Sequence, residues 1–271
     1  GVSSWQLARR VAEIGEIGVV SGTAIDAVLV RELQEGDPHG RLEALETYPD
    51  VDTVNEIRDR YYVPGGKAPD EPYRPKPIHR FTPKVRSQRL LSAAAYSEVR
   101  LARRGHDGTI GINLMAKLKR YTLGVLYGAM LAGVDLILMG AGIPREEAKQ
   151  VLRLAEGNSA SLSLDPTIAE GYDGETNFSY ELDPADLVPG PEPIDAPAFY
   201  PIVSSDVLAR VLDRRLPEEA IDGWVIEMPE AGGHNAPPRG KQYDAHDRPV
   251  YDEKDEVDLE RIRGLGKPFF L

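Results

Sequence analysis

Apolar and polar positions alternate along the chain in two different periods. The segment 3–15 places Trp5, Ala8 and Ala12 at helical spacing, and a short β-branched run bounded by glycines follows at 17–22. Apolar residues three to four positions apart form one face of a helix, whereas a short continuous apolar run is typical of a buried strand. The pattern therefore predicts a helix followed by a buried strand.

The same unit recurs along the rest of the chain. We expect strands at 110–114, 134–140, 199–205 and 223–228, and helices at 120–133, from Pro144 to about 154, and from 206 to 216. Pro144 suits a helix start because its missing N–H has no helical partner there.

Strands that are apolar throughout and alternate with helices indicate an α/β fold with a parallel sheet buried on both faces. Their spacing does not distinguish a closed barrel from an open, doubly wound sheet. Six strand centres can be marked, at Val19, Ile112, Ile137, Ile202, Val225 and Phe269. One more strand at each end would bring the count to the eight of a TIM-type (β/α)8 barrel.

We expect one domain over residues 1–271, truncated at both ends. The chain begins with Gly1 just before a helix, and it stops at Leu271 inside an apolar run. A terminal strand with no following turn would leave backbone groups unpaired.

Two stretches interrupt the alternation, at about 36–80 and 156–198. Both are rich in proline, glycine and charged residues, so we expect long loop insertions. Loops of that length in a compact domain are usually lids, binding loops or disordered segments.

Composition narrows the possible functions. The chain has no cysteine, which excludes disulfides, thiolate nucleophiles and cysteine-bound metals, and its five histidines lack paired ligand spacing, so we expect no metal site. A net charge of -12 opposes nucleic-acid binding, and we interpret the basic stretch 74–89 as a solvated face or an intramolecular partner. No apolar run is long enough to span a membrane, so a cytoplasmic protein is expected.

The loop 230–240, EAGGHNAPPRG, carries the strongest candidate chemistry. Gly232 and Gly233 allow the backbone to approach a flat ligand closely, because neither has a Cβ atom. His234 then projects from the carboxyl end of a strand, where barrel and open α/β enzymes place their active sites. Histidine suits proton transfer near neutral pH, although an ordinary turn with a surface histidine is the alternative.

Other strand ends offer weaker candidates. Gly140 and Gly142 do not complete a dinucleotide fingerprint, because Arg145 stands where a third glycine is required, so they form a turn near a cofactor ring or a plain tight turn. Asn113 could hydrogen-bond a heterocycle or simply satisfy a loop. Ser204 and the serine after it could line the site or cap the next helix.

Four segments in this order, GINLM at 111–115, LMGAGIP at 138–144, PIVSS at 201–205 and DGWVIEMPEAGGH at 222–234, resemble the nitronate monooxygenase family. They are also similar to flavin-dependent enoyl-acyl carrier protein reductases, which share the fold. No hydrolase elbow, P-loop or paired-carboxylate pattern competes with this resemblance.

The resemblance implies a flavoprotein oxidoreductase: a (β/α)8 barrel that holds non-covalent FMN at its carboxyl-terminal mouth. It assigns His234 as catalytic base or substrate-orienting group. It assigns the lining of the flavin pocket to Asn113, Gly140, Gly142, Ser204, Gly232 and Gly233. A small-molecule alkyl nitronate would then be oxidised with molecular oxygen, with the flavin carrying the electrons. The first strand and strands seven to eight of the family fold are missing or cut here, so we expect an incomplete FMN site.

Two other interpretations stay open. One keeps the flavin barrel but changes the reaction to NAD(P)H-dependent reduction of an enoyl thioester or a quinone. The other is a non-catalytic, barrel-derived binding protein that uses the proline-rich insertion to contact a partner. A homo-oligomer is compatible with all three.

Overall fold

Six parallel strands form the centre of the protein. The structure is a computed structural model that describes residues 3–164, 166, 173–174, 176–229, 231, 235–240 and 242–271. The sheet contains β1 (Gly18–Ser21), β2 (Ile110–Met115), β3 (Leu136–Gly140), β6 (Ala198–Val203), β7 (Trp224–Ile226) and β8 (Phe269–Phe270). These strands neighbour one another in that order, and every pairing is parallel. All six predicted strand centres are therefore confirmed.

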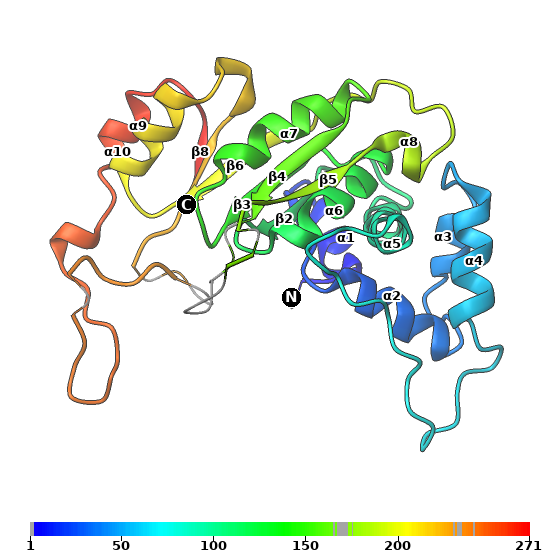
Figure 1. The fold of residues 1–271 in the computed structure, drawn as a ribbon. Helices are drawn as coiled ribbons and strands as arrows, with labels where there is room; N and C mark the ends of the chain where they lie inside the picture. Colours follow the sequence, from blue (N-terminus) through cyan, green and yellow to red (C-terminus); the bar gives the residue numbers. More distant parts are fainter. Residues whose placement is uncertain are drawn as a thin grey trace.

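Helices connect the strands of the sheet. They are α1 (Trp5–Glu13), α2 (Ile25–Gln34), α3 (Arg41–Leu45), α4 (Val51–Tyr61), α5 (Val85–Ala102), α6 (Lys119–Leu131), α7 (Arg145–Ala155), α8 (Pro184–Leu187), α9 (Asp206–Arg215) and α10 (Leu259–Arg263), with short 3-10 turns η1 (Glu218–Ala220) and η2 (Glu253–Asp255). In Figure 1, α9 and α10 lie beside β8, whereas α3 and α4 lie at the opposite end, beyond α5.

The sheet curls, and its two faces differ in burial. On the helix-covered face, register aligns Val20, Ile112, Ile137 and Phe199, all of which are buried. The adjacent row on the other face is Ser21, Asn113, Leu138 and Tyr200, none of which is buried. We call this second face the concave face.

The expectation that the strands are buried on both faces was therefore wrong for the described residues. The curled parallel sheet forms half of a barrel. A half-barrel has no strands opposite its inner face, so the inward side chains stay partly open to solvent.

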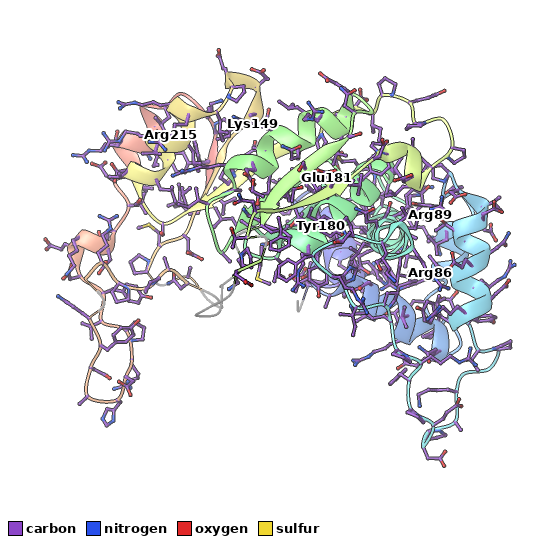
Figure 2. All side chains as sticks on the ribbon, in the orientation of Figure 1. Arg86, Arg89, Lys149, Tyr180, Glu181 and Arg215 are labelled. Atoms are coloured by element: carbon purple, nitrogen blue, oxygen red, sulfur yellow. The ribbon has the colours of Figure 1, made fainter. Side chains whose placement is uncertain are left out.

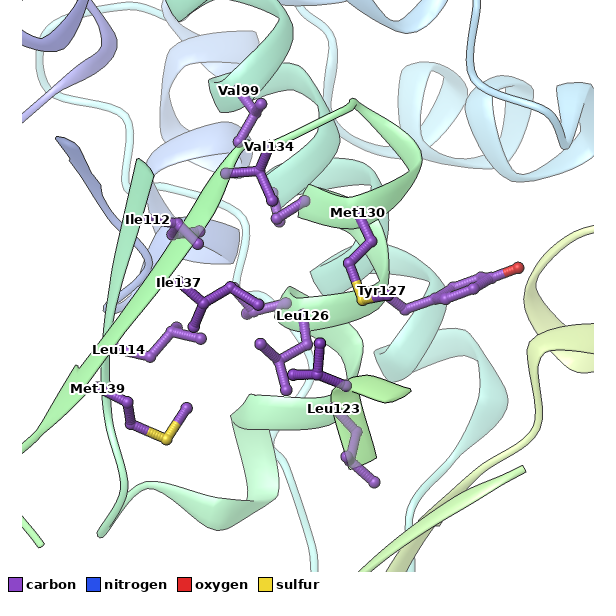
Figure 3. Packing of buried hydrophobic residues seen from close by; sticks show 14 of the residues in the cluster. Val99, Ile112, Leu114, Leu123, Leu126, Tyr127, Met130, Val134, Ile137 and Met139 are labelled. Atoms are coloured by element: carbon purple, nitrogen blue, oxygen red, sulfur yellow. The ribbon is translucent and has the colours of Figure 1, made fainter. Parts of the chain in front are cut away.

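The core lies between the sheet and helices α5 and α6. Figure 3 shows Leu126 of α6 near Ile137 of β3, and Leu123, Met130 and Met139 belong to the same cluster. All five side chains are at most 1% exposed. Burial of that many apolar side chains, at roughly 25 cal/mol per Å², stabilises the sheet against the helices.

Helix α5 is the most buried helix and was absent from the sequence-based prediction. Of its 18 residues, 14 are buried. Two arginines in its N-terminal turns contact neighbouring elements. Arg86 pairs with Glu56 of α4, and Arg89 Nε donates to the Asp186 carbonyl at 2.7 Å. Both arginines are labelled in Figure 2. The basic stretch 74–89 thus has intramolecular partners at this end.

The two predicted loop insertions contain regular structure. The stretch 36–80 holds α3 and α4, and 156–198 holds α8 and an antiparallel pair, β4 (Ala160–Leu164) with β5 (Phe178–Leu182). The expectation of purely loop-like insertions was wrong. Burial explains the difference, because Leu45, Ile57, Leu162 and Tyr180 join the core and supply the apolar contacts that short elements need.

Candidate functional site

The carboxyl ends of the parallel strands lie along one edge of the half-barrel. This edge collects Gly22 after β1, Ala116 after β2, Gly140 at the end of β3, Ser204 after β6 and Glu227 after β7. Ligand sites of parallel α/β proteins occur at such an edge, because loops from several strands converge there. The described candidates from the sequence all lie at this edge or next to it.

Asn113 lies on the concave face of β2, one register row before the edge. Its side chain is exposed, and within the described ranges it has no hydrogen-bond partner. An amide offers both a donor and an acceptor. The alternative that Asn113 only satisfies a loop is therefore not supported by its surroundings.

The turn after β3 is tight, and each of its glycines has a structural reason. A Cβ atom on Gly140 would lie 3.0 Å from Cβ of Ile202, so this glycine lets β3 and β6 approach. Gly142 has a φ of +150°, a backbone conformation that residues with a side chain rarely adopt. A Cβ atom there would also lie 3.0 Å from the Ala116 methyl carbon. Packing alone thus explains Gly140, and the turn is compatible with either interpretation made from the sequence.

The two serines that follow β6 differ in their hydrogen bonds. Ser205 Oγ accepts a hydrogen bond from the Leu208 amide at 3.1 Å and caps α9. Ser204 makes no capping hydrogen bond among the described residues, and both serines line a cavity. Ser204 is therefore the serine whose hydroxyl is not committed to the helix.

Gly232, Gly233 and His234 lie outside the described residues, as does Glu230. The described residues on both sides of them are held by side-chain hydrogen bonds. Asn235 Nδ2 donates to the Pro229 carbonyl at 2.8 Å, and the Ala236 amide donates to Glu227 Oε2 at 3.1 Å. Glu227 is half-buried and accepts this hydrogen bond from the far side of the 232–234 segment.

A cavity of about 230 Å³ opens beside these residues, and we call it the β6–β7 cavity. Ser204, Glu227 and Asn235 line it together with Arg239 and Tyr251. Tyr251 donates from its hydroxyl to the Ala236 carbonyl at 2.9 Å. The cavity is polar and brings Ser204 to the residues that flank the 232–234 segment.

A second cavity, of about 200 Å³, lies at the ends of β1 and β2, and we call it the β1–β2 cavity. Its walls are mostly apolar and include Leu114, Met115 and Leu118. Its polar side chains come from distant segments. Asp26 lies in the first turn of α2, Tyr121 in the first turn of α6, and Lys76 in the stretch between α4 and α5.

A buried cluster of ionisable groups adjoins this cavity. The Asp26 carboxylate is fully buried, and its Oδ2 lies 2.7 Å from Lys76 Nζ and 2.8 Å from His79 Nε2. Burial acts to raise the pKa of Asp26, but hydrogen bonds from His79 and Lys76 outweigh it and hold that pKa below its ordinary value. An ionised carboxylate only accepts hydrogen bonds, so His79 Nε2 is the donor.

His79 has a second constraint. Its ring packs against Tyr121, with centroids 4.5 Å apart, and its backbone carbonyl accepts from Arg120 Nη1 at 2.9 Å. Its Nδ1 is buried and has no hydrogen-bond partner in the described part of the chain. Nε2 is therefore the ring nitrogen that fixes His79 through a hydrogen bond in this part of the structure.

Sequence reasoning missed Asp26, Lys76 and Tyr121, and recorded His79 only as one of five histidines. Asp26 follows Gly22 and the turn after β1, and this position just beyond a strand end is a local signal for a site residue. Lys76 and His79 offer none, because the residues they meet are 50 or so positions away in the chain.

Among the residues that the structure describes, no helix combines the length and the apolar character needed to cross a bilayer. In the same residues, histidine, aspartate and glutamate nowhere gather in a group of three suited to a metal ion. Comparison with known proteins adds no assignment, because no protein-family model matches the chain and no curated protein matches its sequence.

Proposed function

We propose that this chain carries the catalytic loop of an FMN-dependent oxidoreductase that oxidises alkyl nitronates with molecular oxygen. One observation carries the proposal: Asn113, Gly142 and Ser204 lie at or next to the carboxyl edge of one curled parallel sheet. The half-barrel is compatible with a (β/α)8 barrel, the fold that the resemblance implies.

The chemistry of this edge fits the ring system of a flavin. The Asn113 amide is exposed and lacks a protein partner among the described residues, and Ser204 contributes a hydroxyl to the β6–β7 cavity. Leu138 and Ile202 supply a partly open apolar surface on the concave face. Asn113 and Ser204 would therefore hold polar atoms of the ring, and the bound flavin would supply the redox chemistry.

The role proposed for His234 is proton transfer or orientation of the substrate. The flanking contacts of Glu227 and Asn235 support it, because they fix the ends of the loop beside the β6–β7 cavity. Placing a general base on a fixed loop raises the rate of proton transfer by roughly 10²–10⁴-fold.

The test begins with the visible absorption spectrum of the purified full-length protein after addition of FMN, followed by nitronate-dependent oxygen uptake. We expect flavin absorbance, oxygen uptake, and a loss of kcat/KM of about 100-fold or more in His234→Ala. His246→Ala removes an exposed histidine from the turn at 244–250 and serves as the matched control, with unchanged rates expected.

Three results would count against the proposal. Absence of flavin binding would remove the flavoprotein assignment and favour a binding protein. Rapid bleaching of bound flavin by NADH or NADPH, without nitronate turnover, would favour the enoyl-thioester or quinone reductase instead. Equal kcat/KM in His234→Ala and wild type would remove the role of His234 alone.

A further inference from the structure

We propose that the β1–β2 cavity is a binding site for a small organic anion with a short apolar chain, held by Lys76, Tyr121 and Thr23. This site is separate from the 232–234 segment, which follows β7 at another part of the edge. The proposal does not rest on the flavin chemistry proposed above.

The size and walls of the cavity set the class of ligand. Its volume of about 200 Å³ lies below the roughly 300–1,000 Å³ of sites for drug-sized molecules, so the ligand is small. Leu114, Met115 and Leu118 line it with aliphatic side chains, which favour an apolar body. Few polar groups reach it, as is usual for sites that orient an apolar ligand by its head group.

The available polar groups are donors of hydrogen bonds. Lys76 has three N–H donors and a side chain that is 27% exposed. Its Nζ pairs with Asp26 and lies 5.7 Å from the centroid of the Tyr121 ring. The hydroxyls of Tyr121 and Thr23 have no hydrogen-bond partner within the residues that the structure describes. These donors meet at one cavity from three separate segments.

The sign of the charge favours an anion. Asp26 also borders the cavity, but its side chain is 0% exposed, whereas the Lys76 ammonium is partly open. The open side of this ion pair is therefore the lysine, and the field of its ammonium attracts an anion.

Asp26 and His79 act as positioning residues for Lys76. Oδ2 of Asp26 lies 2.7 Å from the Lys76 ammonium. The same oxygen accepts a hydrogen bond from Nε2 of His79 at 2.8 Å, and the His79 side chain is buried. Holding a lysine in place before binding reduces the side-chain entropy lost when a ligand arrives. The stretch between α4 and α5 therefore contributes a preorganised cation to the strand edge.

The experiment is calorimetric titration of the intact protein with sodium acetate, butyrate and hexanoate at constant ionic strength. Butan-1-ol and butylamine match butyrate in chain length but lack the negative charge. We expect one carboxylate site, with butyrate at least 10-fold tighter than the alcohol or the amine. Lys76→Met should weaken butyrate at least 10-fold, while the control Lys67→Met, in the same stretch but outside the cavity, should leave it unchanged.

Two further variants keep the test decisive if Lys76→Met fails to fold. Tyr121→Phe removes only a hydroxyl and should weaken butyrate binding several-fold, and Leu118→Trp should block the longer hexanoate by filling the cavity.

Failure of all three carboxylates to bind, equal binding of butanol, or unchanged binding in folded Lys76→Met would overturn the proposal. If Lys76→Met does not fold, unchanged binding in both other variants would overturn it. None of these outcomes depends on flavin, so they are distinguishable from failure of the oxidoreductase proposal.

Discussion

Burying the Asp26 carboxylate costs desolvation free energy, and two side chains from another part of the chain offset that cost. Its carboxylate meets Lys76 and His79, and its Oδ1 also accepts a hydrogen bond from the Ala27 amide at 2.9 Å. Removing one partner from a buried ion pair usually costs more than the pair itself contributes, because the remaining charge stays unpaired. Asp26 therefore couples the stability of the fold to the geometry of the β1–β2 cavity.

We expect Asp26→Asn to lower the free energy of unfolding by about 3 kcal/mol at pH 7, the low end of the range for breaking a buried pair, because Lys76 retains some contact with water. The depressed pKa of Asp26 means that its contribution is present above the unfolded value, about 3.9, and is lost as pH falls through the lower folded value. The gap between variant and wild type should thus shrink below about pH 4.

Urea unfolding at pH 7, 5, 4 and 3 would measure this gap. Asp59→Asn replaces an exposed carboxylate whose side chain is 74% exposed and should show almost no gap at any pH. A gap for Asp26→Asn that stays constant down to pH 3 would contradict the role assigned to its charge.

At the scale of elements, α5 and α6 cross at unusually close range. A Cβ atom on Gly128 would lie 2.0 Å from the Ser92 carbonyl oxygen and 2.6 Å from Ser92 Cα, so the two backbones are nearly in contact. Neither backbone atom can rotate away. Glycine on α6 therefore sets the distance between the two helices that cover the sheet.

We expect Gly128→Ala to destabilise the protein by about 2 kcal/mol. Alanine gains about 1 kcal/mol in helix propensity, but overpacking at a backbone contact costs about 3 kcal/mol. Denaturant unfolding measures the difference. The same substitution at Gly264, where a Cβ would meet nothing closer than 3.4 Å, should cost less than about 0.5 kcal/mol. A Gly128→Ala variant as stable as wild type would show that the helices can separate freely.

For the whole molecule, burial is concentrated on one side of the sheet. Helix α5 and strands β2 and β3 lie in the main core, whereas β8 has two residues and, in the described part of the chain, pairs only with β7. The stretch 242–250 is exposed except at Asp244. Local opening costs least where few apolar contacts and few backbone pairs hold a segment.

Native-state hydrogen exchange should reflect this gradient. We expect the slowest amides in α5, β2 and β3, and exchange at least 100-fold faster at Phe270 and in 242–250, since a hundredfold difference needs only about 2.7 kcal/mol in opening free energy. Mass spectrometry of peptic fragments would resolve these segments. Equal protection of β8 and α5 would contradict a core centred on α5.

The alternation of apolar runs and helices was sufficient to predict the six strands, because an apolar run buried in a parallel sheet is a local property of the sequence. The same local signals placed Asn113, Gly140 and Ser204 at strand ends, and the parallel sheet then brought those ends to one edge. His234 stays a prediction from sequence.

The tertiary structure decided the rest. It gave α5 its place in the core, and it assigned helix capping to Ser205 rather than to Ser204. It also brought Lys76 and His79 to Asp26 across about 50 residues of chain. Periodicity reports which face of an element is buried, but it carries no information about which distant segment covers that face. That choice depends on the packing of the whole chain, and here it created the charged cluster beside the β1–β2 cavity.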